Sequence, residues 1–455
     1  VGSMSASQDD AMAFPLTSRD DGSNASWYNR AFTQTLLLGA VCFCVPGMWN
    51  SITSMAGGIS DKSVSSAATA SLYACFAVAS ILAPVPTNII GARATLGLGS
   101  MGYVLYVLAL LLYSKGQVGS GLVIAAGAVN GLGAGLLWTA QGALIMSYPS
   151  KDTKGLYQAY FWLVFNLGAV FGGLLSFGMN YSSDAGDASP GTFLAFGAVM
   201  VFGGLLTVVM APAENVTRPD GSYVTVQPFP SVVNELRALS QLVGDWRLIA
   251  LTPLFLYSNW FYAYQFVSYN SKLFNARTEG LNNTFYWGAQ MIGALLIGKF
   301  LDSSPLSLRR RALVSFLSIA AAIAGSWAWG LAANTGYRLD ETPTEIDFQD
   351  GRWPAAALLY LLWGFCDAFI QCWVYWLLGQ LDQSPEVLSR FAGGYKAIQC
   401  VGAAASWALS TGTTKPSTQA WINVALLACS LPSTVYMLLR TPQLPDEAPQ
   451  QPPQT

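Results

Sequence analysis

Histidine is absent from the 455-residue sequence, and charged residues make up only 10% of it. Without imidazole, the chain can form neither a Ser-His-Asp triad nor a histidine metal site. An ordinary soluble protein carries about 25% charged residues. The low charge content therefore excludes a disordered chain, a nucleic-acid binder and an ordinary soluble enzyme.

Two further motifs of enzymes and metal proteins are missing. The chain has no GxxxxGK[ST] motif, so it has no ATP site of that type. Its seven cysteines all lie in apolar stretches and show no zinc-ligand spacing. We therefore expect no cofactor, no metal and no enzymatic activity.

Apolar and small residues dominate instead. Apolar types make up 53% of the chain and aromatic types 13%, with 15 tryptophans and 44 glycines. Tryptophan anchors helices at membrane interfaces, and glycine lets membrane helices approach closely. Because a membrane helix needs about 20 residues, the chain has room for about a dozen spans. The composition predicts an all-α, polytopic membrane protein.

Apolar runs and polar breaks predict twelve spans in two sets of six. We expect a disordered tail over 1–30, a six-helix bundle over 31–212, a central loop over 213–247, a second bundle over 248–440 and a disordered tail over 441–455. Six spans, a long polar segment and six further spans are the layout of two bundled halves. The spans are placed near 31–52, 66–90, 94–114, 118–148, 157–180, 190–212, 248–275, 281–301, 308–333, 354–382, 390–412 and 417–440.

The distribution of basic residues predicts the orientation. About twice as many lysines and arginines fall on the side of the two tails as on the other side. Cytoplasmic segments carry this excess, so we expect both termini and the central loop in the cytoplasm. Of the N-x-[ST] motifs, only Asn180 and Asn282 then lie on the side where glycans are added, which makes the chain a candidate glycoprotein.

Six local motifs resemble the major facilitator superfamily, and more closely its uncoordinated-93-like branch as found in fungi. They are Pro46-Gly47-Met48-Trp49-Asn50-Ser51, GLGAGLLWTAQGALIMSYP (131–149), SNWFYAYQF (258–266), RTEGLNNTFYWGAQMIGA (277–294), Gly364-x-x-Asp367-Ala368-x-x-Gln371 and RFAGGYKAIQCVGAA (390–404). The resemblance extends over most of 31–440. It implies two six-helix bundles around a central cavity. Relatives in this branch include a regulatory subunit of an ion channel and a chaperone of receptor trafficking, besides proteins regarded as transporters.

Asp367 is the one carboxylate expected at mid-depth in the membrane, where an ionised group is costly. Gln371 lies one turn further on the same helical face. The pair predicts a site of proton coupling or gating, with a purely structural hydrogen bond as the alternative. Lys396 is the one basic residue well inside a span. It either extends to the interface or supplies an anion-attracting or gating charge to the cavity.

Polar and aromatic residues in other spans are candidates for the cavity wall. In the seventh span Tyr262, Gln265 and Tyr269 are spaced i, i+3, i+7 on one stripe, which suits an amphipathic organic solute. An aromatic belt near the membrane interface explains part of the same pattern. The expected wall residues are Asn50, Trp138, Gln141, Asn166, Asn259, Tyr262, Gln265, Tyr269, Gln290 and Gln371.

The connections at the inner face are candidate gates. Arg93 follows a glycine turn in the first half, and the equivalent connection in the second half carries Asp302, Arg309 and Arg311. Such charges either pair with helix ends and hold the gate, or simply anchor the loops on the cytoplasmic side. In the first half, the acid typical of the superfamily is replaced by Asn88.

Two functional hypotheses follow. The first is a secondary transporter that moves a small organic solute by alternating access, possibly with protons, across the lipid bilayer. The second is a non-transporting membrane regulator or trafficking adaptor with a channel or receptor as its protein partner. The mid-depth acid favours the first, and the branch resemblance with the missing inner-loop acid favours the second.

Overall fold

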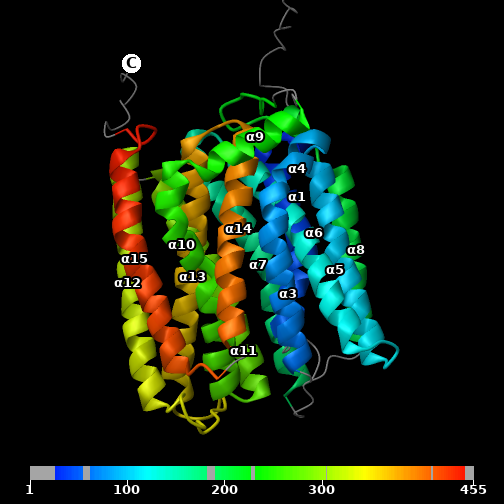
Figure 1. Ribbon diagram of the computed structural model, residues 1–455, viewed down its shortest axis with the longest axis vertical. Helices are drawn as coiled ribbons and strands as arrows, with labels where there is room; N and C mark the ends of the chain where they lie inside the picture. Colours follow the sequence, from blue (N-terminus) through cyan, green and yellow to red (C-terminus); the bar gives the residue numbers. More distant parts are fainter. Residues whose placement is uncertain are drawn as a thin grey trace, which may run out of the picture.

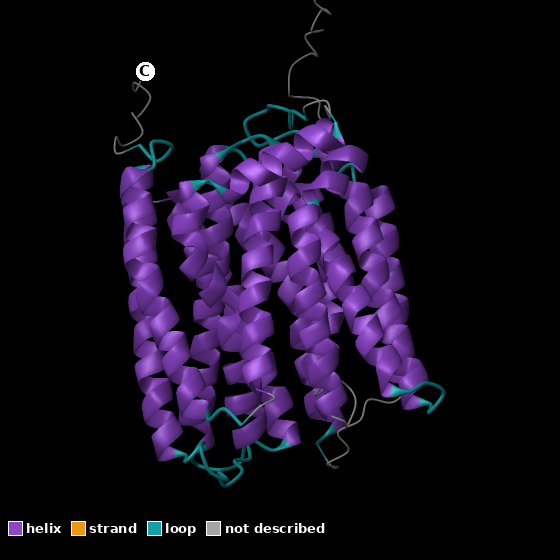
Figure 2. Cartoon of the chain, in the orientation of Figure 1, coloured by secondary structure: helices purple, strands orange, loops and turns teal. Residues whose placement is uncertain are grey.

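The structure is a computed structural model that describes residues 26–54, 62–181, 190–226, 231–303, 305–410 and 413–445 (Figure 1). These residues are almost entirely helical, with isolated bridges in place of a sheet (Figure 2). Most of the two predicted tails, 1–25 and 446–455, lies outside the described residues. Within the first tail, η1 (Trp27–Asn29) is a 3-10 turn, and Arg30 after it bridges to Thr217.

The first half contains six spans. The first is interrupted: α1 (Ala31–Cys42) leads into the π-helical segment η2 (Phe43–Gly47) and then α2 (Met48–Ser54). Pro46 lies inside η2 and lacks the N–H that regular α-helical bonding needs. The other spans are α3 (Lys62–Leu82) with α4 (Pro84–Ile90), α5 (Ala92–Ser114), α6 (Ser120–Ser147), α7 (Lys154–Met179) and α8 (Pro190–Val209).

The second half repeats this order after the central segment. Its first span is again interrupted, because α10 (Trp246–Ala263) continues as the π-helical segment η6 (Tyr264–Ser271). The remaining spans are α11 (Ala276–Ser303), α12 (Leu308–Gly336), α13 (Trp353–Leu381), α14 (Pro385–Ser410) and α15 (Pro416–Arg440). The central segment, predicted as a loop, contains a short amphipathic helix, α9 (Val232–Val243), whose N-cap Ser231 accepts a hydrogen bond from the Asn234 N–H.

Among the described residues, nine helical stretches are long and apolar enough to cross a membrane. α10 with η6, α11 and α14 are of similar length but more polar, and they complete the twelve predicted spans. In lipid, backbone polar groups must bond within the segment, so the helical form is enforced even where side chains are polar. Polar residues in such helices belong in the protein interior.

The two halves meet mainly where α7 packs against α11 and where α3 and α6 pack against α14. Glycines allow these approaches. A Cβ on Gly298 would lie 2.5 Å from the Gly155 carbonyl oxygen, and a Cβ on Gly393 would lie 2.4 Å from the Ser80 carbonyl oxygen. Figure 1 shows the helices standing side by side, with α9 across one end. We call this end, which also carries both described chain ends, the α9 end, and the other the loop end.

The internal repeat extends to single hydrogen bonds. Arg93, at the start of the third span, donates to the Met210 carbonyl at the end of α8 (2.9 Å). Arg309, at the start of the third span of the second half, donates to the Thr441 carbonyl at the end of α15 (3.4 Å). Each arginine thus neutralises the negative end of the last helix of its own half.

Candidate functional site: a cavity between the two halves

A cavity of about 200 Å³ lies between the halves and runs from the middle of the bundle to the loop end. Its deepest polar residues come from the middle of α14, and its outermost residues include Ser65 in the first turn of α3 and Glu279 in the first turn of α11. Both halves supply aromatic walls: Tyr73, Phe76, Tyr103, Trp138, Trp162 and Phe165 from the first, and Tyr262, Phe266, Trp287 and Trp407 from the second. Such a mixture of aromatic rings and a few polar groups is typical of small-molecule sites.

Part of the expected wall is on this surface. Asn50, Trp138, Asn259, Tyr262 and Gln371 line the cavity, and so does Lys396, which was expected as a coupling or gating charge. Gln399, which the sequence reasoning missed, lines it beside Lys396. It lies three residues after Lys396 on the same face of α14, a spacing that could have identified it.

Other expected wall residues lie behind the surface. Gln141, Asn166, Gln265, Tyr269 and Gln290 are at most 2% exposed. Gln265 accepts a hydrogen bond from the Tyr286 hydroxyl, and Tyr269 donates to the Ala356 carbonyl. Gln265 and Tyr269 therefore do not share the cavity wall with Tyr262, as the predicted stripe of the seventh span requires.

The difference in the seventh span has a structural cause. The spacing i, i+3, i+7 assumes a regular α-helix, but the chain is π-helical over Tyr264–Ser271. The i→i+5 bonding of a π-helix widens the turn and rotates later side chains to a new direction. Phe266 and Asn270, at i+4 and i+8 from Tyr262, therefore lie on the wall.

Asp367 is 1% exposed and lies one layer behind the wall, where it accepts four hydrogen bonds. Oδ2 is bonded by the Tyr262 hydroxyl (2.8 Å), Gln290 Nε2 (2.7 Å) and the Tyr286 hydroxyl (3.3 Å), and Oδ1 by Gln371 Nε2 (3.2 Å). Tyr262 and Gln371 separate the carboxyl group from the cavity. Tyr286 was not predicted, although it is one turn before Gln290 on the same helix.

A second connection joins Asp367 to the first half. Trp162, on the cavity wall in α7, donates from Nε1 to Gln290 Oε1 (2.9 Å). Gln290 in turn donates to Asp367. The acid of the second half is therefore linked through one amide to a ring of the first half.

Lys396 is 5% exposed and does not extend to the interface. Its Nζ lies 4.8 Å from the Trp138 ring centroid, 5.1 Å from that of Tyr395 and 5.4 Å from that of Tyr375. It donates to Gln399 Oε1 (2.7 Å). The ammonium group is thus held over aromatic faces at the deep end of the cavity.

At the α9 end, a buried cluster joins the halves through α9. Arg390 of α14 donates from Nε and Nη2 to the Glu235 carboxylate of α9 (2.7 and 2.6 Å). Asn88 of α4 donates to the same carboxylate (2.9 Å) and accepts from the Ser389 hydroxyl (3.0 Å). Glu235 is 1% exposed. Glu235 belongs to the central segment. Its carboxylate lies beside Asn88, the residue that replaces an acid in the connection between the second and third spans.

Asp302 makes the corresponding tie on the other side of the bundle. Its two carboxylate oxygens accept from the N–H groups of Gly155 (2.8 Å) and Leu156 (2.6 Å) in the first turn of α7. A carboxylate is favourable there because the first helical turn has free N–H groups and a positive partial charge. Of the expected gate residues, Asp302 alone bonds the opposite half in the interactions described. Arg311 bonds the Leu301 carbonyl within its own half.

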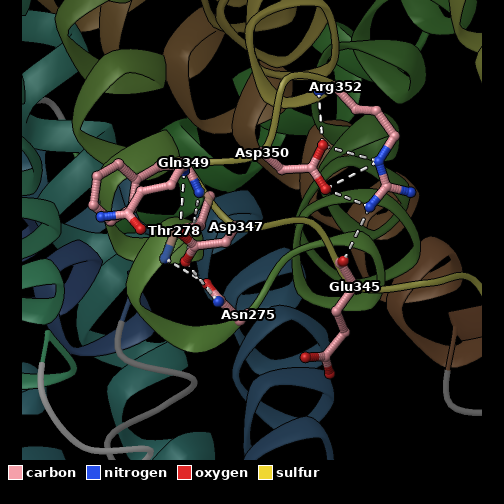
Figure 3. A network of polar contacts seen from close by, with 8 residues as sticks. Asn275, Thr278, Glu345, Asp347, Gln349, Asp350 and Arg352 are labelled. Carbon is pink, nitrogen blue, oxygen red and sulfur yellow. Dashed lines mark hydrogen bonds and ion pairs between the residues drawn. The ribbon is translucent and has the colours of Figure 1, made fainter.

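At the loop end, residues of 345–352 form a network of polar contacts with Asn275 and Thr278 (Figure 3). Asp347 is partly buried, which opposes ionisation, but hydrogen bonds from Arg277 and Asn275 lower the pKa of Asp347 to about 2. Hydrogen bonds from Arg352 lower the pKa of Asp350 to about 2. These acids are paired with arginines of the same surface.

The candidate glycosylation sites are buried. Asn180 is 8% exposed and donates to the Ser176 carbonyl, and Asn282 is 1% exposed and bonds Asn270 and Trp353. A glycan needs a surface asparagine. The folded chain therefore does not support glycosylation at either position.

Comparison with known proteins identifies the family. The model of the Major Facilitator Superfamily matches residues 36–407. UNC93-like protein 1 of Arabidopsis thaliana is 39% identical over 416 residues, which cover 90% of each chain. An UNC93-like protein of Schizosaccharomyces pombe is 36% identical over 390 residues, covering 84% of this chain and 77% of the relative. The chain belongs to the Major Facilitator Superfamily, in its UNC93-like branch.

Solved structures confirm the predicted fold. The proton:xylose symporter XylE superposes with a TM-score of 0.61 at 12% identity, covering 93% of this chain and 98% of the symporter. FucP, a transporter of the superfamily in the outward conformation, gives a TM-score of 0.57 at 13% identity, over 89% of this chain and 98% of FucP. At this identity the likeness establishes the architecture of two six-helix bundles in a multi-pass membrane protein.

Proposed function

We propose that the protein is a secondary transporter that moves a small organic solute by alternating access. The observation that carries the proposal is the cavity between the halves, which reaches the loop end while buried contacts between the halves close the α9 end. In such carriers the two halves rock around a central site and expose it to each side in turn. The residues 31–212 and 248–440 are the two rocking bodies, joined by 213–247.

The orientation belongs to the same proposal. Among the described residues, about twice as many lysines and arginines lie at the α9 end as at the loop end. We assign the α9 end, with both termini, to the cytoplasm on this basis. The cavity then faces away from the cytoplasm, and the clusters of Glu235 and Asp302 form the closed cytoplasmic gate.

Asp367 is the proposed site of proton coupling. An ionised carboxylate accepts about four hydrogen bonds, which is the number present. The Tyr286 hydroxyl has a single proton and also contacts Gln265 Oε1 at 2.9 Å. When Asp367 is protonated, the Tyr286 oxygen can accept a hydrogen bond from the carboxyl O–H while the Tyr286 O–H donates to Gln265. The cluster thus satisfies both protonation states without moving a helix.

The solute and the proton site communicate through shared side chains. Tyr262 and Gln371 face the cavity and also donate to Asp367. A solute that engages either group withdraws a donor from the carboxylate, which favours its protonated form. Trp162 holds the Gln290 amide in the orientation that donates to Asp367, so an opening between the halves that breaks the Trp162–Gln290 bond frees Gln290 to turn away from the carboxylate.

One argument for the alternative function, a non-transporting regulator or adaptor, is weakened by the structure of the α9 end. It depended partly on the inner-loop acid missing at Asn88, but Glu235 brings a carboxylate to that place and binds Asn88 directly. The gate at the α9 end is therefore complete in both halves. The branch resemblance remains a reason to test for a protein partner.

A metabolite panel tests the proposal on purified protein. A transporter shows at least one solute that raises its melting temperature, and Tyr262→Ala abolishes this effect. Tyr436→Ala is the matched control, because Tyr436 is 55% exposed on the outside of the bundle. The proposal is wrong if no solute stabilises the protein and a protein partner co-purifies instead.

A further inference from the structure

The deep end of the cavity has an uncompensated positive charge. Among the described residues that line the cavity, only Lys396 and Glu279 are charged. Glu279 lies in the first turn of α11 at the loop end, whereas Lys396 lies in the middle of α14. The two charges therefore occupy opposite ends of the cavity.

The structure gives Lys396 no carboxylate partner among the described residues. Its ammonium donates to Gln399, Gln399 Nε2 donates to Gln371 Oε1 (3.1 Å), and Gln371 donates to Asp367 (3.2 Å). Two glutamines thus separate the ammonium from the nearest carboxylate in this chain. A buried cation without an anion is costly, and aromatic faces compensate for only part of that cost.

The amides beside Lys396 are placed to assist an anion. Gln371 and Gln399 line the cavity next to it. Each has N–H groups that can turn from their present partners towards a carboxylate oxygen. Above this floor, Trp138 and Phe165 meet edge to face, with ring centroids 5.3 Å apart. The exposed faces and edges of such rings favour contact with an apolar or aromatic body.

We infer that the transported solute is an organic monoanion, with its carboxylate on Lys396 and its flat apolar body between the aromatic walls. The inference rests on the proposed function and specifies its substrate class. The anion supplies the missing partner of a buried ammonium, and the rings of both halves enclose the rest of the molecule. A cationic solute would place its charge against Lys396 and is rejected.

A charge-matched ligand series tests the inference. The probes are benzoate, phenylacetate and 3-phenylpropionate, with benzamide, phenylacetamide and phenethylamine as neutral and cationic counterparts. Calorimetry on the purified wild-type protein gives the dissociation constants. We expect at least one carboxylate to bind about tenfold or more tightly than its amide, which corresponds to about 1.4 kcal/mol, since hydrogen bonds to a charged group are stronger than those between neutral groups. The amine should not bind.

Variants locate the effect. Lys396→Met keeps the length of the side chain and should weaken carboxylate binding by about tenfold or more while leaving amide binding unchanged. Lys396→Arg keeps the charge and should retain part of the preference. Lys115→Met is the control, because Lys115 is exposed after α5 and away from the cavity.

Three results would overturn the inference. They are amide or amine binding as tight as carboxylate binding, carboxylate binding unaffected by Lys396→Met, and no carboxylate binding by the wild type. The wild-type comparison decides the matter even if the Lys396 variants fail to fold. A neutral or cationic solute that binds in a Tyr262-dependent manner in the metabolite panel would refute the anion and support transport, so the two failures are distinguishable.

Discussion

At the scale of single residues, Asp367 is the proposed site of proton coupling. Asp367→Asn keeps the size of the side chain and imitates the protonated acid. We expect it to retain solute exchange and to lose accumulation driven by a proton gradient, because no carboxylate remains to bind and release the proton. Proteoliposomes measure both activities side by side, with an imposed gradient in one assay and counterflow in the other.

Two outcomes would reject this role. If Asp367→Asn still concentrates solute on the gradient, the proton does not pass through this residue. If the variant loses exchange together with folding yield, the acid is structural. Glu345→Gln is a suitable control, because Glu345 is an exposed acid of the loop-end surface.

Asp347 predicts a pH dependence at the loop end. Its pKa in the folded chain is about 2, below the ordinary 3.8. The charged form is thus preferred by the folded state, so the Arg277 pair stabilises the loop above pH 4 and loses this contribution as the pH falls towards 2. Asp347→Asn should speed hydrogen exchange over 339–350 at pH 7, and the difference from wild type should disappear near pH 2.

The matched control for Asp347 is Asp350→Asn. Asp350 pairs with Arg352 on the exposed surface, where water screens the charges. Its effect on exchange should be smaller than that of Asp347→Asn. Equal effects, or a difference that persists at pH 2, would show that the Arg277 pair does not order the loop.

The sequence predicted only part of the site, for reasons that particular residues show. Asp367 and Lys396 were recognisable because a charge in an apolar span is rare. Their surroundings were not, because Gln265 and Tyr269 turn away from the cavity where the helix becomes π-helical. Neither local composition nor spacing signals the start of that segment in the seventh span.

At the scale of secondary-structure elements, α9 is predicted to hold the closed gate. Glu235→Ala removes the partner of Arg390 and Asn88 and leaves a half-buried arginine unpaired. Losing one partner of a fully buried ion pair costs about 3–5 kcal/mol, and the partial exposure of Arg390 makes the cost here smaller. We expect faster hydrogen exchange in the first turns of α4 and α14, measured by mass spectrometry on the purified protein.

The control for α9 is Arg237→Ala, on the exposed face of the same helix. It should leave exchange in α4 and α14 unchanged. Unchanged exchange in Glu235→Ala would mean that α9 does not contribute to closure. The sequence did contain a signal for this helix: Val232, Leu236, Leu239 and Val243 follow a helical period after the capping residue Ser231.

The contact of α7 with α11 gives a second prediction at this scale. Gly298→Ala places a methyl group 2.5 Å from the Gly155 carbonyl oxygen, so the helices must separate. Such overpacking costs about 1–3 kcal/mol and should lower the melting temperature. Gly288→Ala on the same helix meets no atom within 4 Å and should be neutral or slightly stabilising. Equal melting temperatures for the two variants would contradict the close packing.

At the scale of the whole molecule, the two halves share one design with different parts. In each half the first span contains a π-helical segment beside the cavity, and an arginine of the third span bonds a carbonyl at the end of the last helix. The closures differ. Asp302 of the second half bonds α7 directly, whereas the first half depends on Asn88 and on Glu235 from the central segment. The order of spans and the local motifs predicted that the two halves repeat each other. The contacts that close the α9 end could not be predicted in this way, because they join residues far apart in the sequence.

Transport itself is the central claim, and the contents of proteoliposomes test it most directly. Liposomes with the purified protein are incubated in a mixture of small metabolites under a proton gradient, washed and analysed by mass spectrometry. We predict that wild-type liposomes accumulate at least one solute that is absent from Tyr262→Ala and protein-free liposomes. Identical contents in all three, with a correctly folded wild-type protein, would contradict the account.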